Sequence, residues 1–376
     1  MSKWTNKQKM KAFIHRHLKV IDRFIMGKYL GTFVFTMGIF AAVSVVFDVS
    51  EKLDNFTNKH ASLHDIIFQY YAGFVPFYLN MLSPLINFLA VIFFTAKMAN
   101  QTEIVPILSG KASFNRFLRP YFIASTIIFI VSFFANVYLI PYTNHLKNDF
   151  ENANGITDND PTKIEVHMQI DKHTFVYLQN YDPTVHTGYQ FIMEKFNGDT
   201  LREKLIAQQV TYDSVKRVWS LKNYQVKYIN GLKEQFLSPA TPKDTTLDMH
   251  PSDFVVYDNV YAAMSLKDLN NNINKEKLRR PEVLNNLYYE KYHRFIYPLS
   301  AYVLTIVGVA LSSRKVRGGV GLPLGIGIIL CFTYIIVERF AIVFSIKGGV
   351  PPIFTVFIPN TTFGLLGYYL LLKAPK

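Results

Sequence analysis

Few residues of this sequence have the types and spacing that catalysis or metal binding requires. The ten histidines are scattered and form no His-Glu-x-x-His pair, and no Gly-x-Ser-x-Gly turn occurs. Cys331 is the only cysteine, which excludes an intramolecular disulfide and any Cys-based metal site. Gly110-Lys111 resembles the end of a phosphate-binding loop, but Val105 replaces its first glycine and Ala112 its Ser or Thr. We therefore expect no catalytic residue, no metal, no cofactor and no nucleotide hydrolysis by this chain itself.

One pair of ionisable residues lies inside a strongly apolar segment. Glu338 is the acid deepest in the late part of the sequence, and Arg339 follows it directly. Ionisable residues inside a membrane usually have a functional role. Two interpretations of Glu338 stay open, a structural pairing with a neighbouring helix and a role in transport.

Six apolar segments must position these residues, each about long enough to cross a bilayer core of ~30 Å. The predicted spans are about Tyr29–Val49, a second one broken by Pro76 and Pro84 (Ile66–Phe77 and Ser83–Met98), Pro120–Ile140 ending in Pro141, Phe295–Leu311, Val320–Phe344 and Ile353–Leu372. The expected fold is an α-helical membrane protein with six transmembrane helices, three plus three, and an inserted β-jellyroll domain. The expected domains are residues 1–141, with a cytoplasmic N-terminal segment, 142–283 and 284–376.

The charge distribution gives an orientation. The net charge is +13, and residues 1–30 hold eight basic residues against Asp22 alone. The segments 97–119, 313–319 and the C-terminus are also basic. Basic flanks remain in the cytoplasm, so we expect both termini there and residues 142–283 in the periplasm. Since the positive charge lies beside apolar segments, we expect a membrane partner and no nucleic acid.

The segment between the third and fourth spans alternates apolar and polar residues. Asn197-Gly198 and Asn230-Gly231 follow two such runs, which predicts hairpins. Several short strands favour a sandwich or jelly roll. A generic β domain without activity of its own is the alternative. Four aromatic residues are candidates for its apolar interior: Phe175, Tyr177, Phe191 and Trp219. Ser265 resembles the cap of a polar helix over 266–279 that Pro281 interrupts.

The segment between spans two and three holds Glu103 near the start of a predicted short helix, Thr102–Leu108. A carboxylate is favoured at the positive end of a helix. Short cytoplasmic helices between spans are a common way for transporter subunits to dock an ATPase. A solvated loop is the alternative.

Several motifs, taken in order and with their spacing, resemble the lipopolysaccharide-export permeases of the LptF/LptG (YjgP/YjgQ) family over essentially the whole chain. The motif residues are Asp22 and Arg23 within Ile-Asp-Arg-Phe-Ile, Thr102-Glu103-Ile104 with Ser113 and Arg116, then Glu290, Arg294 and Pro298, and finally Pro351, Pro352 and Pro359-Asn360. The Gly-Val-Pro-Pro turn at 349–352 is more similar to LptG than to LptF.

Two features depart from the family pattern. The glycine of the coupling segment is one place early, at Gly110, and Lys111 stands where glycine is expected. Some relatives carry lysines near a lipid gate at the end of the first span. Here Asp48, Glu51 and Lys52 occupy that stretch, so they are the gate or cavity candidates.

The resemblance implies a permease subunit of an ABC transporter in the bacterial inner membrane, which extracts lipopolysaccharide from the outer leaflet. Two homologous permeases, an LptF/LptG pair, would enclose a cavity entered between the first span of one and the fifth of its partner. A cytoplasmic LptB-like ATPase dimer would dock through Glu103, Ser113 and Arg116. The jellyroll would join a single-span LptC-like subunit and an LptA-like periplasmic bridge.

Two other functions compete with this one. The chain could be the permease of another ATP-linked lipid or lipoprotein exporter, although such permeases often have four spans. It could also be an envelope assembly protein without transport. Charge reversal at Glu103 separates transport from assembly, and co-purified lipid separates the two transporters.

Overall fold

The computed structural model describes residues 19–58, 62–110, 113–154, 165–182, 185–239, 241–254, 260–316 and 319–373. The chain divides into two compact units. The membrane unit combines Met1–Lys147 with Tyr289–Lys376, and the β unit is Asn148–Tyr288. Each is described by itself.

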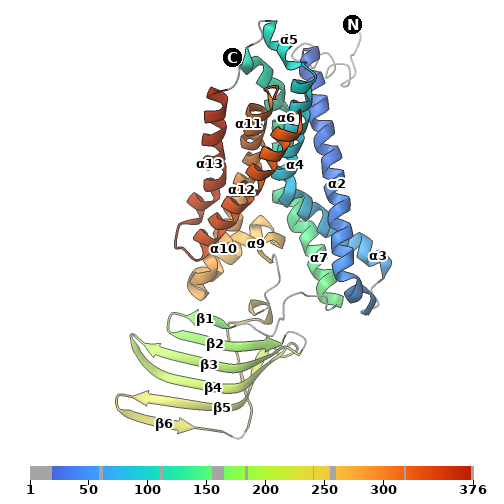
Figure 1. The fold of residues 1–376 in the computed structure, drawn as a ribbon. Helices are drawn as coiled ribbons and strands as arrows, with labels where there is room; N and C mark the ends of the chain where they lie inside the picture. The colour runs from blue at the N-terminus through green and yellow to red at the C-terminus, as the bar shows by residue number, and fades with distance from the viewer. Residues whose placement is uncertain are drawn as a thin grey trace, which may run out of the picture. The chain divides into compact units, whose positions relative to one another are not determined.

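The membrane unit is a bundle of helices (Figure 1). Its elements are α2 (Val20–Asn58), α3 (Leu63–Asp65), the π-helix η1 (Ile66–Tyr71), α4 (Ala72–Asn100), α5 (Ile104–Ser109), α6 (Phe114–Phe134), the π-helix η2 (Ala135–Leu139), α7 (Ile140–Asn154), α10 (Pro281–Ile296), the 3-10 turn η4 (Tyr297–Leu299), α11 (Ser300–Ser312), α12 (Gly321–Ile346) and α13 (Pro352–Leu372). Helices α7 and α10 run across the division between the units. Six helical segments of the described chain are long and apolar enough to cross a membrane, which confirms the predicted spans.

The third span does not end where the sequence predicts. The π-helix η2 directly precedes α7, and the helix runs past Pro141 to Asn154. In a π turn the hydrogen bonds run over five residues, so the missing N–H of Pro141 falls in an already widened turn. The prediction that Pro141 ends this helix is therefore wrong.

The second span tolerates Pro84 because another helix supplies a hydrogen-bond donor. Pro84 has no N–H to offer the carbonyl of Asn80, four residues earlier in α4. The hydroxyl of Tyr297 lies 3.1 Å from the Asn80 carbonyl oxygen and 2.6 Å from that of Met81. Neighbouring helices commonly re-satisfy such carbonyls in membranes.

A buried polar network ties together three helices of the membrane unit. The Tyr29 hydroxyl of α2 donates to Asn87 Oδ1 of α4 at 2.5 Å and lies 2.8 Å from Thr305 Oγ1 of α11. Asn87 Nδ2 donates to the Ala301 carbonyl at 3.2 Å. Each of these polar groups is satisfied without water, as an apolar surrounding requires.

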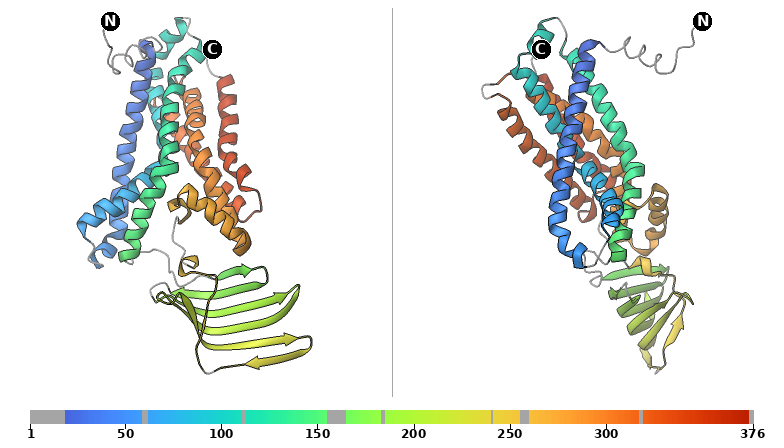
Figure 2. Two further views of the ribbon diagram at one scale, coloured as in Figure 1. Left: turned by 180° about the vertical axis from the view of Figure 1, so that it is seen from behind. Right: turned by 90° about the vertical axis from the view of Figure 1, so that its right-hand side faces the viewer.

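The β unit contains one antiparallel sheet whose first six strands lie side by side in chain order (Figures 1 and 2). Its strands are β1 (Val166–Asp171), β2 (Thr174–Asp182), β3 (Thr187–Asn197), β4 (Thr200–Asp213), β5 (Val218–Asn230), β6 (Lys233–Leu237) and β7 (Lys243–Thr245), which also pairs with β5. Both predicted hairpins form, since Asn197 pairs with Thr200 and Asn230 with Lys233. Their first central residues, Gly198 and Gly231, have φ of +59° and +62°, which a glycine adopts without strain.

One face of the sheet carries the apolar core of the β unit. Phe191 and Trp219 are fully buried there, and Trp219 Nε1 donates to the Met249 carbonyl at 3.0 Å. Phe175 and Tyr177 alternate with the buried Val176 and Leu178 along β2, so they lie on the opposite face, where Phe175 is 42% exposed. The expectation that these two line the apolar interior is wrong, because neighbouring strand residues face opposite sides.

Two short segments and a helix close the β unit: η3 (Pro251–Asp253), α8 (Val260–Ala263) and α9 (Leu266–Arg279). Ser265 caps α9 as predicted, because its hydroxyl accepts from the N–H of Asp268 at 3.2 Å. The described α10 begins at Pro281, directly after the break in the helix.

A buried carboxylate joins η3 to α9. Asp253 accepts from Lys275 Nζ at 2.8 Å and from Arg279 Nη1 at 3.2 Å. Burial alone would raise the pKa of Asp253, but the ammonium of Lys275, the N–H of His250 and the guanidinium of Arg279 outweigh it. The pKa therefore lies below its usual value.

Candidate functional site

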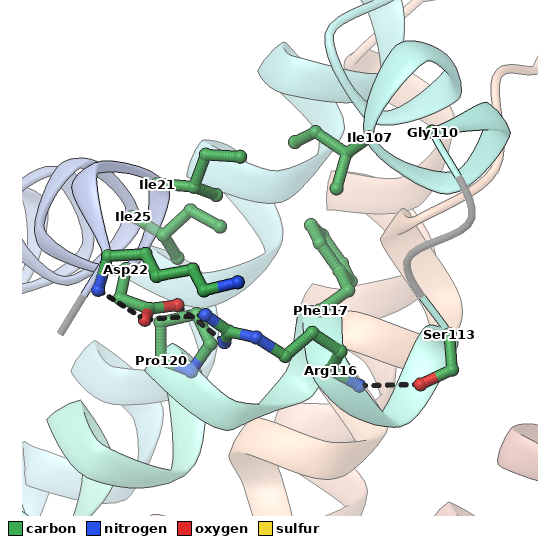
Figure 3. Close-up of a pocket in the computed structure, with 10 residues that line it drawn as sticks. Ile21, Asp22, Ile25, Ile107, Gly110, Ser113, Arg116, Phe117 and Pro120 are labelled. Carbon is green, nitrogen blue, oxygen red and sulfur yellow. Dashed lines mark hydrogen bonds and ion pairs between the residues drawn. The ribbon is translucent and has the colours of Figure 1, made fainter. Parts of the chain in front are cut away.

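A cavity of about 410 Å³ lies at the end of the membrane unit where α2 and α6 begin and α5 is found (Figure 3). Three elements contribute to its wall: the start of α2, helix α5 with its C-cap Gly110, and the first turns of α6. The lining residues are Lys19, Ile21, Asp22, Ile25, Ile107, Gly110, Ser113, Arg116, Phe117 and Pro120. Six of them belong to the predicted motif segments: Ile21, Asp22 and Ile25 to the first, and Gly110, Ser113 and Arg116 to the coupling segment. This makes the cavity the candidate coupling site.

An ion pair spans the cavity wall. Arg116 Nη1 lies 2.6 Å from Asp22 Oδ1 and Arg116 Nη2 2.7 Å from Asp22 Oδ2, a two-point contact (Figure 3). The backbone N–H of Lys19 also donates to Asp22 Oδ2, at 3.0 Å. Asp22 is 1% exposed and Arg116 29%. A buried carboxylate requires such pairing, and the planar guanidinium matches its two oxygens.

Local structure aims Arg116 at its partner. Ser113 is the N-cap of α6, and its hydroxyl accepts from the N–H of Arg116 at 3.3 Å. The cap places Arg116 in the first turn of α6, on the side that faces α2. In the sequence, Ser113 and Arg116 belong to the predicted ATPase contacts and Asp22 to a separate motif, whereas the structure brings all three together.

Helix α5 presents a carboxylate outward. Glu103 is its N-cap, is exposed and makes no side-chain capping bond, whereas Ile104 is only 2% exposed and packs into the core. The helix begins two residues later than predicted, because Thr102 has φ of +59° and cannot belong to it. Arg116 and Glu103 therefore have different surroundings. The Arg116 side chain forms an ion pair within the membrane unit, whereas the Glu103 side chain is exposed and can contact a partner.

The gate candidates at the far end of α2 are mostly turned inward. Asp48 is 7% exposed and accepts from the Tyr70 hydroxyl at 2.8 Å. Lys52 is also 7% exposed, with its ammonium 5.3 Å from the centre of the Tyr70 ring. Only Glu51 of the three is exposed. In this conformation Asp48 and Lys52 do not offer their charges to a lipid.

The remaining family-motif residues lie at positions where they support the helices of the membrane unit. Arg294 is buried and its Nε lies 2.8 Å from Glu290 Oε1, one helical turn away. Pro298 is buried within η4, which separates α10 from α11. Pro351 and Pro352 start α13, where a missing N–H is harmless. Arg23 lies half-buried beside Asp22.

Nothing in the sequence marks the Tyr29–Asn87–Thr305 network, whose three residues look like isolated polar interruptions of apolar runs. Glu338 had two open interpretations, and in the structure its Oε1 lies 3.2 Å from His293 Nε2 of α10. This contact favours the structural interpretation of Glu338. Among the described residues, no group of three or more His, Cys, Asp or Glu is arranged to hold a metal ion.

The fold and this site define a multi-pass membrane protein with an inserted β domain. The sequence matches the family model of the lipopolysaccharide export system permeases LptF/LptG over residues 23–373, so the chain belongs to that family. Its general role is therefore that of a non-catalytic permease in a lipopolysaccharide export system. A comparison with curated proteins found no match.

Proposed function

We propose that this chain is the permease subunit of an ABC transporter that extracts lipopolysaccharide from the outer leaflet of the inner membrane and passes it toward the outer membrane. Family membership supports the substrate. The observation that carries the transporter role is helix α5, with Ile104 anchored in the core and Glu103 exposed. An LptB-like ATPase dimer docks there, with Glu103 as its main contact.

The Asp22–Arg116 pair connects the docking helix to the first span. Helix α5 leads into α6 through residues 110–113, and Arg116 in the first turn of α6 holds the first turn of α2. A displacement of α5 by the ATPase therefore reaches α2 through a two-point contact rather than through loose packing. Ser113 and Arg116 act in coupling, but from inside the permease.

Two helices offer surfaces for a second, homologous permease. In the most apolar stretch of each span, 6% of α2 and 22% of α12 is buried, compared with 67% of Val283–Ser312. These are the first and fifth spans, between which lipopolysaccharide would enter in an LptF/LptG pair.

The basic flanks support a cytoplasmic location for both termini. The start of α2, α5 and the end of α13 lie at one end of the bundle, in agreement with a single basic side (Figure 1). The β unit is then periplasmic. It carries the lipid onward by joining an LptC-like jellyroll subunit and, through it, an LptA-like bridge, by strand addition at its edge strand β6, whose residues are all exposed.

The test is a pulldown of the full chain in mild detergent, with mass analysis of the bound proteins and lipids. Glu103→Arg should lose the ATPase, because it reverses the charge that α5 presents. Gln101→Arg is the matched control, since it introduces the same guanidinium into the same exposed loop and keeps the Glu103 carboxylate. It should retain the ATPase.

Three outcomes bear on the proposal. Retention of the ATPase by Glu103→Arg would contradict the docking role of that residue. A wild-type chain that binds the ATPase and a lipoprotein instead of lipopolysaccharide would indicate another exporter. A wild-type chain that binds neither ATPase nor lipid would overturn transport altogether and favour an assembly role.

A further inference from the structure

Helix α12 turns one row of residues toward the rest of the membrane unit, and an acid interrupts this inward row. Its buried residues follow one another at intervals of three, four or seven: Pro323, Gly327, Cys331, Tyr334, Ala341 and Ser345. Glu338 fills the interval of seven, four residues after Tyr334 and three before Ala341. Because positions three and four apart lie on one side of a helix, Glu338 belongs to the inward row. The fifth span therefore packs through a row that contains a carboxylate.

The partner of this carboxylate lies on the fourth span. Glu338 Oε1 is 3.2 Å from His293 Nε2 of α10, and the two side chains are 18% and 22% exposed. The imidazole of His293 packs in turn against the rings of Tyr289 and Tyr297, with centroids 5.6 and 4.5 Å away. The two rings hold the imidazole in one place, so Glu338 meets a fixed donor.

His293 is also the end of a chain of contacts that crosses the second, third and fourth spans. Asn80 of α4 and Asn136 of η2 exchange amide hydrogen bonds of 3.0 and 3.1 Å. The hydroxyl of Tyr297 donates to the Asn80 carbonyl at 3.1 Å, and its ring contacts His293. The contact of His293 with Glu338 adds the fifth span to this chain.

An acid in the inward row selects one register of α12, that is, one choice of the residues that face the fourth span. A carboxylate in apolar surroundings is costly unless it is paired. A rotation of α12 by one residue, about 100°, would take Glu338 away from His293 and toward lipid. A single polar residue in a packed row fixes the register in this way, at a cost in stability. The register of α12 has little other support, because only 22% of its most apolar stretch is buried, compared with 67% for Val283–Ser312.

We propose that His293 and Glu338 are positioning residues that fix the register of the fifth span, and with it the face of α12 that borders the opening for lipid. The inference rests on the proposed function for the role of the fifth span. It deepens that function by naming the contact that holds the span in place. Neither residue needs to touch the lipid.

The same contact responds to pH. A neutral imidazole donates a hydrogen bond to the carboxylate, whereas an imidazolium forms an ion pair with it, which is the stronger contact. The other ionisable groups around the pair are Tyr334 and Arg339 of α12, Tyr289, Glu290 and Arg294 of α10, and Tyr297 of η4. Of these residue types, histidine alone ordinarily changes its charge between about pH 6 and 8. A fall in pH over this range therefore holds the fifth span more tightly.

Cys331 is a native reporter of the register. It is the only cysteine of the sequence, is fully buried, and lies seven residues, about two helical turns, before Glu338 in the inward row. The test measures the rate at which N-ethylmaleimide labels Cys331 in the purified full chain with its co-purified partners, followed by mass spectrometry. A change of register exposes this thiol and speeds its labelling.

The variants separate a register contact from an ordinary stabilising one. Glu338→Leu should speed labelling about threefold without lowering the thermal midpoint, because leucine packs in the row but selects no register. His293→Leu should speed labelling about tenfold and lower the midpoint, because it leaves the carboxylate unpaired. The double variant should recover the midpoint and keep the faster labelling.

Arg339→Gln is the matched control. It removes a charge from the residue next to Glu338, whose side chain is exposed and lies with Nη2 3.8 Å from Met81 Sδ. Because Arg339 lies outside the inward row, its loss should change the labelling rate less than about twofold.

A second measurement uses pH and a variant that keeps the contact. Relative to the unfolded chain at each pH, labelling of the wild type should slow about threefold from pH 8 to pH 6. His293→Gln offers a neutral N–H donor, so it should label like the wild type at pH 8 and show no slowing at pH 6. This comparison decides the matter if the leucine variants do not fold.

Four results would overturn the inference. They are unchanged labelling in both leucine variants, an equal acceleration by Arg339→Gln, a midpoint that Glu338→Leu lowers as much as His293→Leu does, and identical pH responses of His293→Gln and the wild type. The third result would reduce the pair to a contact that only adds stability.

The labelling requires neither ATP nor lipid, so its outcome does not depend on the proposed function. ATPase activity stimulated by lipopolysaccharide is measured on the same samples, and Glu338→Leu should lower the stimulation about threefold. Faster labelling with unchanged stimulation would overturn the role of the contact in transport. A wild-type complex that lipopolysaccharide does not stimulate would instead contradict the proposed function.

Discussion

Each unit of this protein buries an aspartate against basic side chains, and the two are held in different ways. Asp22 of the membrane unit is 1% exposed and forms its ion pair with Arg116, 94 residues away. Asp253 of the β unit is 7% exposed, pairs with Lys275 and Arg279, and has its backbone carbonyl held by Arg280 at 2.8 Å. The first contact is a single ion pair that joins two helices. The second is a network in which several basic residues bind one aspartate, so it can lose one contact and keep the others.

The largest expected effect is that of Asp22→Asn. It leaves the guanidinium of Arg116 without its charge partner, which destabilises a buried pair by about 2–4 kcal/mol, less than for a fully buried arginine because Arg116 is 29% exposed. Thermal unfolding of the purified chain should show a lower midpoint. Lipid-stimulated ATPase activity of the complex should fall while Glu103 still docks the ATPase. An unchanged midpoint and unchanged activity would refute the joint between α2 and α6.

A smaller loss is expected from Asp253→Asn. Arg279 keeps a second carboxylate partner, Asp248, and Lys275 is 40% exposed, so water compensates part of the loss. We expect about 1–2 kcal/mol. Hydrogen exchange of the full chain should accelerate in η3 and α9 and stay unchanged in α2. Asp22→Asn should accelerate exchange at the start of α2. If Asp253→Asn accelerated exchange in α9 by as much, the two carboxylates would not be held in different ways.

Acid should act on the β unit through the same carboxylate. The pKa of Asp253 is lower in the folded protein than in the unfolded chain, so the unfolded chain binds the proton more readily. The stabilisation is complete above the ordinary aspartate pKa of about 3.9 and is lost as the pH falls through the lower folded value. Exchange in α9, relative to the intrinsic amide exchange rate at each pH, should rise below about pH 4 in the wild type. In Asp253→Asn that component should be missing, and a curve identical to that of the wild type would argue against the assignment.

The smallest effects should come from the two helix caps, which are matched in geometry. Ser113 and Ser265 each accept from the N–H three residues on, at 3.3 and 3.2 Å. Ser113→Ala and Ser265→Ala should each destabilise their helix by about 1 kcal/mol. Ser265 also donates to Asp268 Oδ2 at 2.6 Å. Ser265→Ala should therefore accelerate hydrogen exchange in its own helix more than Ser113→Ala does in α6. A greater stability loss for Ser113→Ala would contradict this order and show that losing the cap also weakens the Asp22–Arg116 pair.

The parts of this fold that the sequence predicts are those with local causes. The six spans follow from apolar length, and the hairpins at Asn197-Gly198 and Asn230-Gly231 follow from turn chemistry. The extension of the third span past Pro141 depends on a π turn that no composition signal marks. The face of β2 on which Phe175 lies depends on the register of the strand, and the hydrophobicity of the residue does not determine it.

The candidate site shows the same division. Glu103 at the start of a short helix was predictable, since its neighbours determine that helix. The partner of Arg116 was not, because Asp22 lies 94 residues earlier and either charge alone looks like a cytoplasmic flank. The pairing of Glu338 with His293 was one of two open interpretations, and only the packing of α12 against α10 favours it.

The hydrogen bond that Tyr297 offers to the second span also sets an order of events during synthesis. The carbonyl groups of Asn80 and Met81 emerge from the ribosome more than 200 residues before the hydroxyl that pairs with them. In the interval the third span and the whole β unit are made. The early half of the protein therefore enters the membrane before the Asn80 carbonyl, which Pro84 leaves without a helical donor, meets its partner. The maturation of the second span depends on the arrival of the fourth.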